Sequence, residues 1–187
     1  MNVERTSIPG VVIITPVMHM DARGSFRESW QRDRYAKIGL PAEWIQDNVS
    51  MSRRGVLRGL HYQYPQPQGK LVTVLRGEII DVAVDVRVGS PTFGRFEAVT
   101  LSSTNGRQLW VPEGFAHGFL VLSEEALVHY KVSQAYDPGG DRTIAWNDPD
   151  IGIDWPTRNP LLSDKDRAGR RLADFSPAEL PHYHDRA

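Results

Sequence analysis

The segment LVTVLRGEIIDVAVDVR, residues 71–87, indicates the fold class. Two runs of β-branched and apolar residues, Leu71 to Arg76 and Ile79 to Arg87, are separated only by a Gly-Glu step, which predicts a β-hairpin. In the second run Asp81 and Asp85 share one face of the strand, and three branched aliphatic residues occupy the other. An acid on a barrel-lining face needs a cation or a donor, and a histidine is the natural partner.

Similar short runs, separated by glycine and proline, continue on both sides of this segment. The predicted strands are Val11 to Pro16, Gly24 to Trp30, Trp44 to Met51, Val56 to Gln63, Phe93 to Leu101, Arg107 to Val111, Gly118 to Leu122 and Leu127 to Gln134. Many short strands at this spacing predict a mainly β fold, either a sandwich or a barrel. Two short helices are also predicted, one near residues 31–38 and one at the C-terminus that begins at the capping residue Ser163.

Length and composition exclude several classes of protein. At 187 residues the chain suits a single domain, residues 1–187, in which we expect residues 175–187 to form a loose tail. The absence of cysteine excludes disulfide scaffolds, thiolate zinc sites and cysteine nucleophiles. A net charge of −1 without a basic block argues against nucleic-acid binding, and the sequence has no signal peptide or membrane-spanning run. We therefore expect a cytoplasmic protein with no nucleic-acid or membrane partner.

Two strand-like segments contain ionisable residues that are expected to be buried. The first is RGLHYQ, residues 58–63, followed by Lys70, and the second is PEGFAHGF, residues 112–119. Ionisable groups are rarely buried without a partner or a function. Taken singly, a strand histidine or a loop lysine is more often structural or solvated than functional. The co-occurrence of these residues, with glycines in both segments, predicts one pocket lined from two sides.

Strand alternation predicts which of these side chains face inward. His117 has the same parity as the phenylalanines two residues before and after it, so it should point to a buried side. Arg58 and His61 have opposite parity, so both enter one cavity only if the strand bulges or twists between them. Gly59 permits such a bulge. Alternation alone leaves the convergence of Arg58 and His61 open.

The second segment resembles the second motif of the cupin family of β-barrels, Pro-x-Gly-x-x-His-x-Phe. Metal-binding cupins also carry His-x-His and then a glutamate in their first motif. In this chain Gln63 stands where the second histidine would be, and Lys70 stands where the glutamate is expected. One or two imidazoles supply too few ligands, and a nearby lysine repels a cation. We therefore expect no metal site and no cofactor.

Longer motifs make the resemblance specific. They are RGLH at 58–61, QGK at 68–70, DVAVD at 81–85, SPTFG at 90–94, the segment 112–119 and WND at 146–148, with DARG at 21–24, QDN at 46–48 and IGIDWP at 151–156 toward the two ends. These motifs occur in the same order as in the dTDP-4-dehydrorhamnose 3,5-epimerase family, which the chain therefore resembles. The members of that family are metal-free sugar-nucleotide epimerases. The resemblance implies a cupin-type jelly roll, a dTDP-sugar substrate, and usually a homodimer whose N-terminal strand joins the partner's sheet.

The resemblance also implies a mechanism and the residues that carry it. The family inverts C3 and C5 of dTDP-4-dehydro-6-deoxy-D-glucose to give dTDP-4-dehydro-L-rhamnose, by removing a proton next to the 4-ketone and returning one to the opposite face. By motif match His61 is the base, oriented by Asp166 with Asp81 as a second neighbour. Lys70 faces the developing enolate oxygen, and Tyr130 is the proton donor.

Further positions match substrate contacts of the family. They are Arg23, Phe26, Glu28, Gln46, Asn48, Arg58, His117, Asp141 and Lys165. The first three belong to the nucleotide end. Gln46, Asn48 and Arg58 match positions near the nucleotide and diphosphate, where the arginine offers a forked contact to phosphate. This chain departs from the pattern at Ser25, where an aromatic residue is common, and at Asp141, where a glutamate is common.

Three alternatives follow from the same residues. A relative that inverts only C3 or only C5 of a related 4-keto sugar would share the fold and most of these motifs. A non-catalytic sugar-binding cupin would tolerate loss of the base and the donor. A metal-dependent oxygenase would contain bound iron. The presence of both His61 and Tyr130 favours an enzyme that inverts C5, because inversion requires delivery from the far face.

Overall fold

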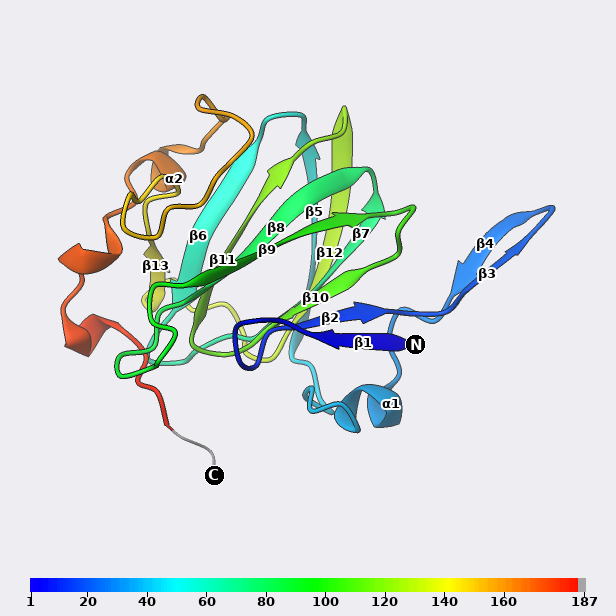
Figure 1. Cartoon of the computed structure of the whole chain (residues 1–187), viewed down its shortest axis with the longest axis horizontal. Helices are drawn as coiled ribbons and strands as arrows, with labels where there is room; N and C mark the ends of the chain where they lie inside the picture. The colour runs from blue at the N-terminus through cyan, green and yellow to red at the C-terminus, as the bar shows by residue number, and fades with distance from the viewer. Residues whose placement is uncertain (185–187) are drawn as a thin grey trace.

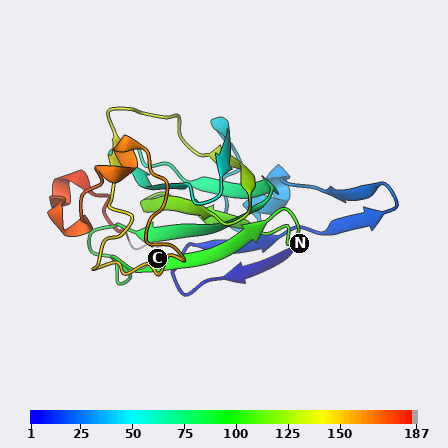
Figure 2. The same cartoon turned by 90° about the horizontal axis from the view of Figure 1, so that it is seen from above.

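In the computed structural model, which describes residues 1–184, two antiparallel sheets pack face to face (Figures 1 and 2). The first sheet has the order β1-β2-β10-β7-β12-β5, with β1 Asn2–Arg5, β2 Val12–Thr15, β10 Gln108–Val111, β7 Lys70–Arg76, β12 Glu125–Val132 and β5 Gln46–Arg53. The second has the order β13-β6-β11-β8-β9, with β13 Asp141–Thr143, β6 Leu57–Gln63, β11 Phe115–Val121, β8 Glu78–Asp85 and β9 Phe96–Ser102. The prediction of a mainly β cupin-like fold is confirmed, as an open sandwich rather than a closed barrel.

Alternation along the strands explains where the core lies. In β8, Ile79 and Ala83 point between the sheets, and Val82 and Val84 point to the other face of the five-stranded sheet. The inner cluster also receives Val72, Val74 and Val128 from the facing sheet. The outer cluster is covered by residues 144–180, which wrap over that face. Both faces of β8 are therefore buried, which is why its apolar residues occupy both faces of the strand instead of only one.

The hairpin predicted for residues 71–87 is wrong. β7 and β8 lie in different sheets: β7 pairs with β10 and β12, and β8 pairs with β9 and β11. Gly77 has a φ of +81° and packs against the start of β12 and the loop before it, so a Cβ there would lie 2.1 Å from the Glu125 carbonyl oxygen. The single residue Gly77 thus connects the two sheets, and apolar side chains of β7 and β8 meet across the core instead of pairing within one sheet.

Two further short elements cover the ends of the sandwich. Helix α1, Arg32–Ala36, begins at Gln31, whose side chain accepts a hydrogen bond from the Arg34 amide. Its residue Tyr35 packs with apolar residues on the outer face of the six-stranded sheet. Helix α2, Asp164–Arg167, begins at Ser163, as the capping signal predicted. In the described part of the chain no helix is long and apolar enough to span a membrane.

The C-terminal segment is packed where a loose tail was expected. Phe175 is 7% exposed and Leu180 3% exposed, and both belong to the outer core cluster. Two 3₁₀ turns, η1 Leu172–Asp174 and η2 Pro177–Glu179, lie in this segment, and the Val88 amide donates to the Pro181 carbonyl at 2.7 Å. The expectation of a loose tail is therefore wrong for residues 175–184, because their apolar side chains cover the second sheet. Residues 185–187 lie outside the described part of the chain.

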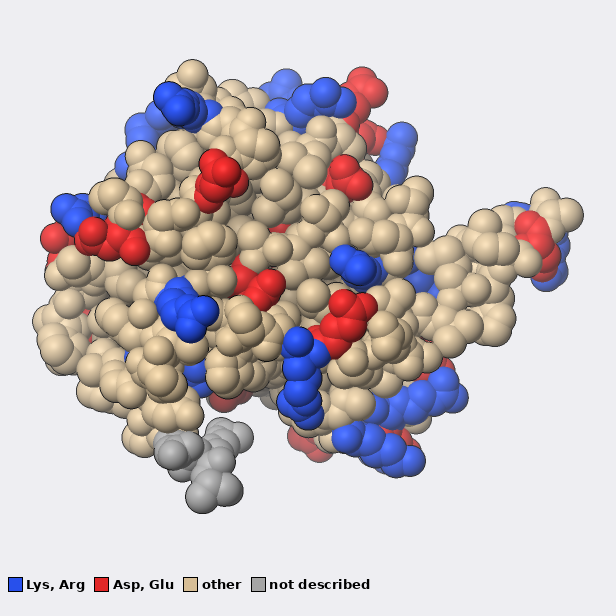
Figure 3. Space-filling model, viewed as in Figure 1, with Lys and Arg blue, Asp and Glu red and all other residues tan. Residues whose placement is uncertain are grey.

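A two-stranded hairpin projects from one end of the sandwich (Figures 1 and 2). It consists of β3, Met18–Asp21, and β4, Gly24–Arg27, which pair only with each other. Met20 is 70% exposed and Phe26 is 71% exposed. In Figure 3 basic and acidic side chains are interspersed over the body, and the hairpin stands clear of it. Exposed large apolar groups on a projecting element are typical of a contact surface.

Candidate active site

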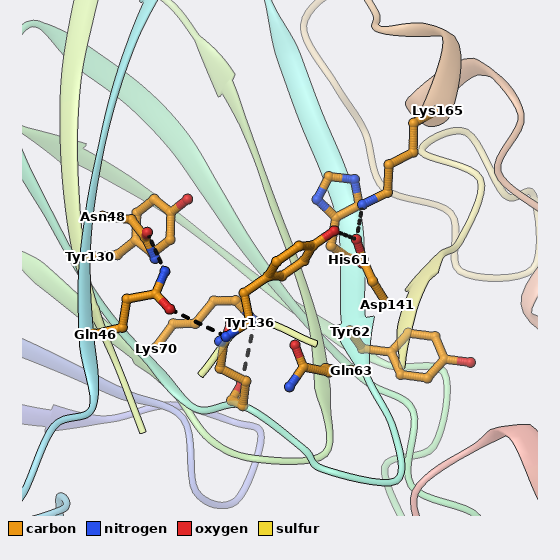
Figure 4. A pocket seen from close by; sticks show the side chains of 11 residues that line it. Gln46, Asn48, His61, Tyr62, Gln63, Lys70, Tyr130, Tyr136, Asp141 and Lys165 are labelled. Carbon is orange, nitrogen blue, oxygen red and sulfur yellow. Dashed lines mark hydrogen bonds and ion pairs between the residues drawn. The ribbon is translucent and has the colours of Figure 1, made fainter. Parts of the chain in front are cut away.

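A pocket of about 310 Å³ opens between the two sheets (Figure 4). Its lining residues come from both sheets, from the loop after β12 and from α2: Gln46, Asn48, His61, Tyr62, Gln63, Gln68, Lys70, Tyr130, Tyr136, Asp141 and Lys165. The volume is within the range of small-molecule sites. Half of the predicted site residues thus meet in one cavity: His61, Lys70, Tyr130, Gln46, Asn48, Asp141 and Lys165.

A bulge in β6 brings His61 into this cavity. Leu57 and Leu60, three residues apart, are both buried in the outer cluster, so one residue between them is out of register. The pairing of β6 with β11 shifts at this point, and Gly59 has a φ of +131°. A Cβ on Gly59 would lie 2.5 Å from the Gly118 Cα. The bulge that Gly59 permits is therefore present.

The same bulge turns Arg58 toward the facing sheet. Its Nε donates a hydrogen bond of 3.0 Å to the Ser52 hydroxyl on β5. Arg58 and His61 therefore both point between the sheets, which answers the question that alternation left open. Arg58 itself is not among the residues that line the pocket.

His61 is held by the carboxylate of Asp166. The distance from His61 Nε2 to Asp166 Oδ1 is 2.6 Å. The Ser163 hydroxyl donates to Asp166 Oδ2 at 2.6 Å, and the Gly59 amide donates to Oδ1 at 3.3 Å. Burial opposes the charge, but these hydrogen bonds lower the pKa of Asp166 below its ordinary value. Since a carboxylate only accepts hydrogen bonds, Nε2 carries the imidazole hydrogen and Nδ1 keeps its lone pair.

Lys70 lines the pocket as a buried amine. The residue is 7% exposed, and Nζ donates to the Gln68 carbonyl at 3.3 Å. Burial lowers the pKa of Lys70 to about 8, although the nearby Asp141 and Asp81 oppose this shift. The ammonium form therefore predominates at neutral pH. A buried cation at this position is suited to stabilise negative charge that develops in the cavity.

Tyr130 lies on the wall opposite His61. It comes from β12 in the six-stranded sheet, whereas His61 comes from β6 in the five-stranded sheet, and Figure 4 shows them on opposite sides of the cavity. Burial raises the pKa of Tyr130, with Arg58 acting in the other direction. The phenol therefore stays protonated over the physiological range of pH. The cavity thus has a basic nitrogen on one wall and an acidic hydroxyl on the other.

The rim of the pocket carries residues that the sequence did not single out. The Tyr136 hydroxyl donates to Asp141 Oδ2 at 2.9 Å, and Lys165 forms an ion pair with the same carboxylate. Gln63 and Gln68 also line the cavity. Tyr136 lies in a loop without a periodic pattern, so alternation gave no signal for it. Gln63 was considered only as a residue that could not bind metal.

Two groups of predicted residues lie elsewhere. Arg23, Phe26 and Glu28 are on or next to the projecting hairpin and do not line the pocket. Arg23 pairs with Asp21 at 2.6 Å, and Glu28 pairs with Arg34 at 3.1 Å.

Asp81 contacts His117 and not His61, so it is not the second neighbour that was expected beside Asp166. The distance from His117 Nε2 to Asp81 Oδ1 is 2.7 Å, and neither residue lines the pocket. Burial raises the pKa of Asp81, against the effects of His117 and Lys70. The general expectation of a histidine partner for this buried acid is met by His117. Among residues 1–184 no cluster of histidine and acidic side chains has the arrangement needed to hold a metal ion.

The fold and the pocket define a cupin-like sandwich whose cavity is equipped for proton transfer. Comparison with known proteins agrees with this class. The sequence profile of the dTDP-4-dehydrorhamnose 3,5-epimerase family matches residues 5–174. A dTDP-4-dehydrorhamnose 3,5-epimerase from Shigella flexneri is 52% identical, over 93% of this chain and 97% of the relative. This chain therefore belongs to the dTDP-4-dehydrorhamnose 3,5-epimerase family.

Two other relatives illustrate the range of the family. The crystal structure of dTDP-6-deoxy-D-glucose-3,5-epimerase from Legionella pneumophila, in complex with dTDP-4-keto-L-rhamnose, superimposes with a TM-score of 0.95 at 49% identity and covers 98% of both chains. A dTDP-4-dehydrorhamnose 3-epimerase from Streptomyces niveus is 42% identical, over 96% of this chain and 88% of the relative. Enzymes described as acting at two carbons and at one carbon are thus both similar to this chain.

Proposed function

We propose that this protein epimerises dTDP-4-dehydro-6-deoxy-D-glucose at C3 and C5 to give dTDP-4-dehydro-L-rhamnose. The observation that carries the proposal is the placement of His61 and Tyr130 on opposite walls of one pocket, with the Lys70 ammonium in the same cavity. Inversion at carbon needs a base on one face, a donor on the other and a stabiliser for the intermediate. These three groups meet those needs.

The reaction follows from the chemistry of the 4-ketone. Nδ1 of neutral His61 takes a proton from the carbon next to the ketone, and the electrons of that C–H bond form an enolate with its negative charge on the C4 oxygen. The Lys70 ammonium stabilises that oxygen. At C3 a proton from solvent reaches the opposite face of the carbon, and the His61 imidazolium releases its proton to solvent before it acts at C5. At C5, Tyr130 gives its phenolic proton to the opposite face of the carbon, and the resulting phenolate is reprotonated from solvent. Asp166 keeps Nε2 protonated, so that only Nδ1 serves as the base.

Solvent exchange tests this assignment directly. In heavy water the wild-type protein should incorporate deuterium into the sugar at C3 and at C5, measured separately by NMR. His61→Asn should abolish both exchanges, since no other group in the pocket has the basic nitrogen at that place. Unaltered exchange in His61→Asn would refute the catalytic assignment and favour a binding protein.

The relative described as a 3-epimerase gives a specific alternative. In that case this protein would invert C3 alone and would leave the hydrogen at C5 in place. Incorporation of deuterium at C3 with none at C5, under conditions of complete turnover, would select this alternative. The higher identity to a 3,5-epimerase, 52% against 42% to the 3-epimerase, supports action at both carbons.

We also propose that the protein works as a homodimer in which the projecting hairpin completes the partner's pocket. Arg23, Phe26 and Glu28 match nucleotide contacts of the family but lie away from this chain's own cavity. The exposed Phe26 on a projecting element is suited to cover a base in a neighbouring molecule. Mixing the inactive variants His61→Asn and Arg23→Glu should restore part of the activity, because one site of each mixed dimer is then intact. Mixtures as inactive as the separate variants would refute this arrangement.

A further inference from the structure

The peptide groups on either side of Tyr136 are held by one buried side chain, that of Gln63. Its Oε1 accepts a hydrogen bond from the Asp137 amide at 3.0 Å, and its Nε2 donates to the Ala135 carbonyl at 3.0 Å. The second N–H of the same amide donates to the Gln66 carbonyl at 2.9 Å. The side chain of Gln63 therefore acts like a strand partner for the backbone at residue 136. At 5% exposure it is shielded from competing water.

Neighbouring contacts fasten the rest of this loop to the same stretch of chain. The Gln68 side chain donates to the Gln134 carbonyl at 2.6 Å, and the Gly69 amide donates to the Ser133 hydroxyl at 2.9 Å. Residues 133–137 are thus held at successive peptides. The Gln63 contacts are the ones that flank Tyr136 on both sides.

This loop carries Tyr136 across the rim of the pocket. The Tyr136 amide donates to Gln46 Oε1 at 3.3 Å on the β5 side, and its hydroxyl donates to Asp141 at 2.9 Å on the β13 side. In Figure 4 the ring runs between these two residues, and its hydroxyl end lies beside Asp141 and Lys165. Tyr136 therefore bridges the two sheets over the cavity, through its backbone amide on one side and its hydroxyl on the other.

We infer that Gln63 is a positioning residue, which holds Tyr136 as a roof over the sugar-nucleotide site. The inference rests on the proposed function for the identity of the substrate. It also gives a role to position 63, at which metal-binding cupins carry their second histidine. In this chain the side chain at that position binds the backbone of residues 133–137, the loop that carries Tyr136. Because the roof touches the substrate before and during the reaction alike, its loss should raise KM more than it lowers kcat.

The test uses the isosteric change Gln63→Glu, which replaces the two donor N–H groups by a carboxylate facing the Ala135 and Gln66 carbonyls. Hydrogen–deuterium exchange of residues 133–140 in the free protein should become at least about tenfold faster. KM for the 4-keto sugar nucleotide should rise about tenfold, with kcat within about threefold of wild type. The control Gln66→Glu makes the same change on an exposed side chain of the neighbouring loop and should leave both measurements unchanged.

A second variant keeps the inference testable if Gln63→Glu does not fold. Tyr136→Phe leaves the Gln63 contacts intact and removes only the hydroxyl that reaches Asp141, so KM should rise with unchanged exchange of the loop. Wild-type loop exchange in Gln63→Glu, or a loss of kcat at unchanged KM in either variant, would overturn the inference. Wild-type protein that fails to turn over the substrate would instead refute the proposed function, and the exchange measurement would still decide whether Gln63 holds the loop.

Discussion

Two histidine–aspartate pairs lie side by side in this protein, and they differ in what surrounds them. His61 on β6 and His117 on β11 are cross-strand partners, and Nε2 of each lies within hydrogen-bonding distance of an aspartate Oδ1, at 2.6 Å for His61–Asp166 and 2.7 Å for His117–Asp81. The side chain of His61 is 29% exposed and lines the pocket, whereas that of His117 is 7% exposed and does not. The same pair of residue types, a histidine and an aspartate, therefore occurs once at the cavity and once inside the core.

The aspartates differ as much as the histidines. Asp166 accepts further hydrogen bonds from Ser163 and Gly59, and its pKa is lowered. Oδ2 of Asp81 is buried without a partner among the described residues, and burial raises the pKa of Asp81. A histidine–aspartate contact does not by itself define a general base. Access to the cavity and a full set of donors around the carboxylate distinguish the pair that is suited to catalysis.

The largest expected effect separates the two histidines. Glutamine in place of histidine keeps a donor near the position of Nε2 but has no basic nitrogen. His61→Gln should lower kcat by about 1000-fold, which is within the usual contribution of a general base. His117→Gln should keep turnover within about tenfold of wild type and should act mainly by lowering the melting temperature. Steady-state kinetics and thermal unfolding of both variants check this, and a comparable loss of kcat in His117→Gln would contradict the distinction.

The two aspartates should differ as the histidines do. Substitution of Asp166 should lower kcat more than substitution of Asp81, and the loss at Asp166 should be smaller than that at His61. Asp166→Asn keeps the shape but presents an amide to His61, which favours the wrong tautomer, so kcat should fall about 100-fold. Asp81→Asn acts on the buried pair and should change kcat by less than about tenfold. The measurement is single-turnover kinetics of both variants. Equal losses would mean that the buried pair takes part in proton transfer.

Tyr130→Phe tests whether Tyr130, on the wall of the pocket opposite His61, is the proton donor to C5. The variant should lose about 100-fold in deuterium incorporation at C5, since general acid–base groups contribute about that much, and should retain exchange at C3. The readout is NMR of the sugar in heavy water. Tyr35→Phe is the matched control, because it removes a hydroxyl that is bonded to Gln108 and does not line the pocket. Equal losses at both carbons in Tyr130→Phe would contradict its role as the C5 donor.

The pH profile should reveal Lys70, which shares the cavity with His61. Its pKa is lowered to about 8 by burial, so the ammonium is present below that pH and is lost as the pH rises through it. Turnover should therefore decline above about pH 8, by at most about tenfold per pH unit. In Lys70→Arg the charge persists, so this decline should disappear even if the overall rate is lower. A basic decline that is unchanged in Lys70→Arg would assign it to another group.

The local sequence predicted the strands better than their partners. Alternation placed His117, Asp81 and the aliphatic residues of β8 on the correct faces, because the side-chain direction in a strand depends only on local geometry. The pairing of β7 with β8 failed, because a short turn after an apolar strand can close a hairpin or cross between sheets. Which of the two occurs depends on the loop before β12 that packs against Gly77.

Prediction of the site was limited in the same way, because the local sequence does not show which distant residues contact one another. The base and its carboxylate are 105 positions apart, so Asp166 was found only through the resemblance to the family. The partner of Asp81 could be predicted as a histidine but not as His117 rather than His61. Tyr136 gave no signal, since its position over the cavity depends on hydrogen bonds from Gln63 and Gln68 on a different strand and loop. Contacts between distant segments are set by the tertiary structure, which a single sequence does not display.

The smallest expected effect is on the free energy of unfolding. Asp166 and Asp81 should change its pH dependence in opposite directions. The lowered pKa of Asp166 means that its contribution is fully present above the ordinary value of 3.8 and is lost as the pH falls below it. The raised pKa of Asp81 means that the folded state holds its proton to higher pH, so stability falls as the pH rises from 3.8 toward that pKa. Each slope is at most about 1.4 kcal/mol per pH unit for one proton.

Urea unfolding of the asparagine variants against pH measures both slopes. Relative to wild type, Asp166→Asn should become less stable as the pH rises toward 4, because only the wild type gains the stabilised carboxylate. Asp81→Asn should become more stable relative to wild type as the pH rises above 4, because only the wild type must then ionise a buried acid. Slopes of the same sign would show that the two carboxylates have equivalent surroundings. In that case exposure of the histidine alone would distinguish the pair at the pocket from the pair in the core.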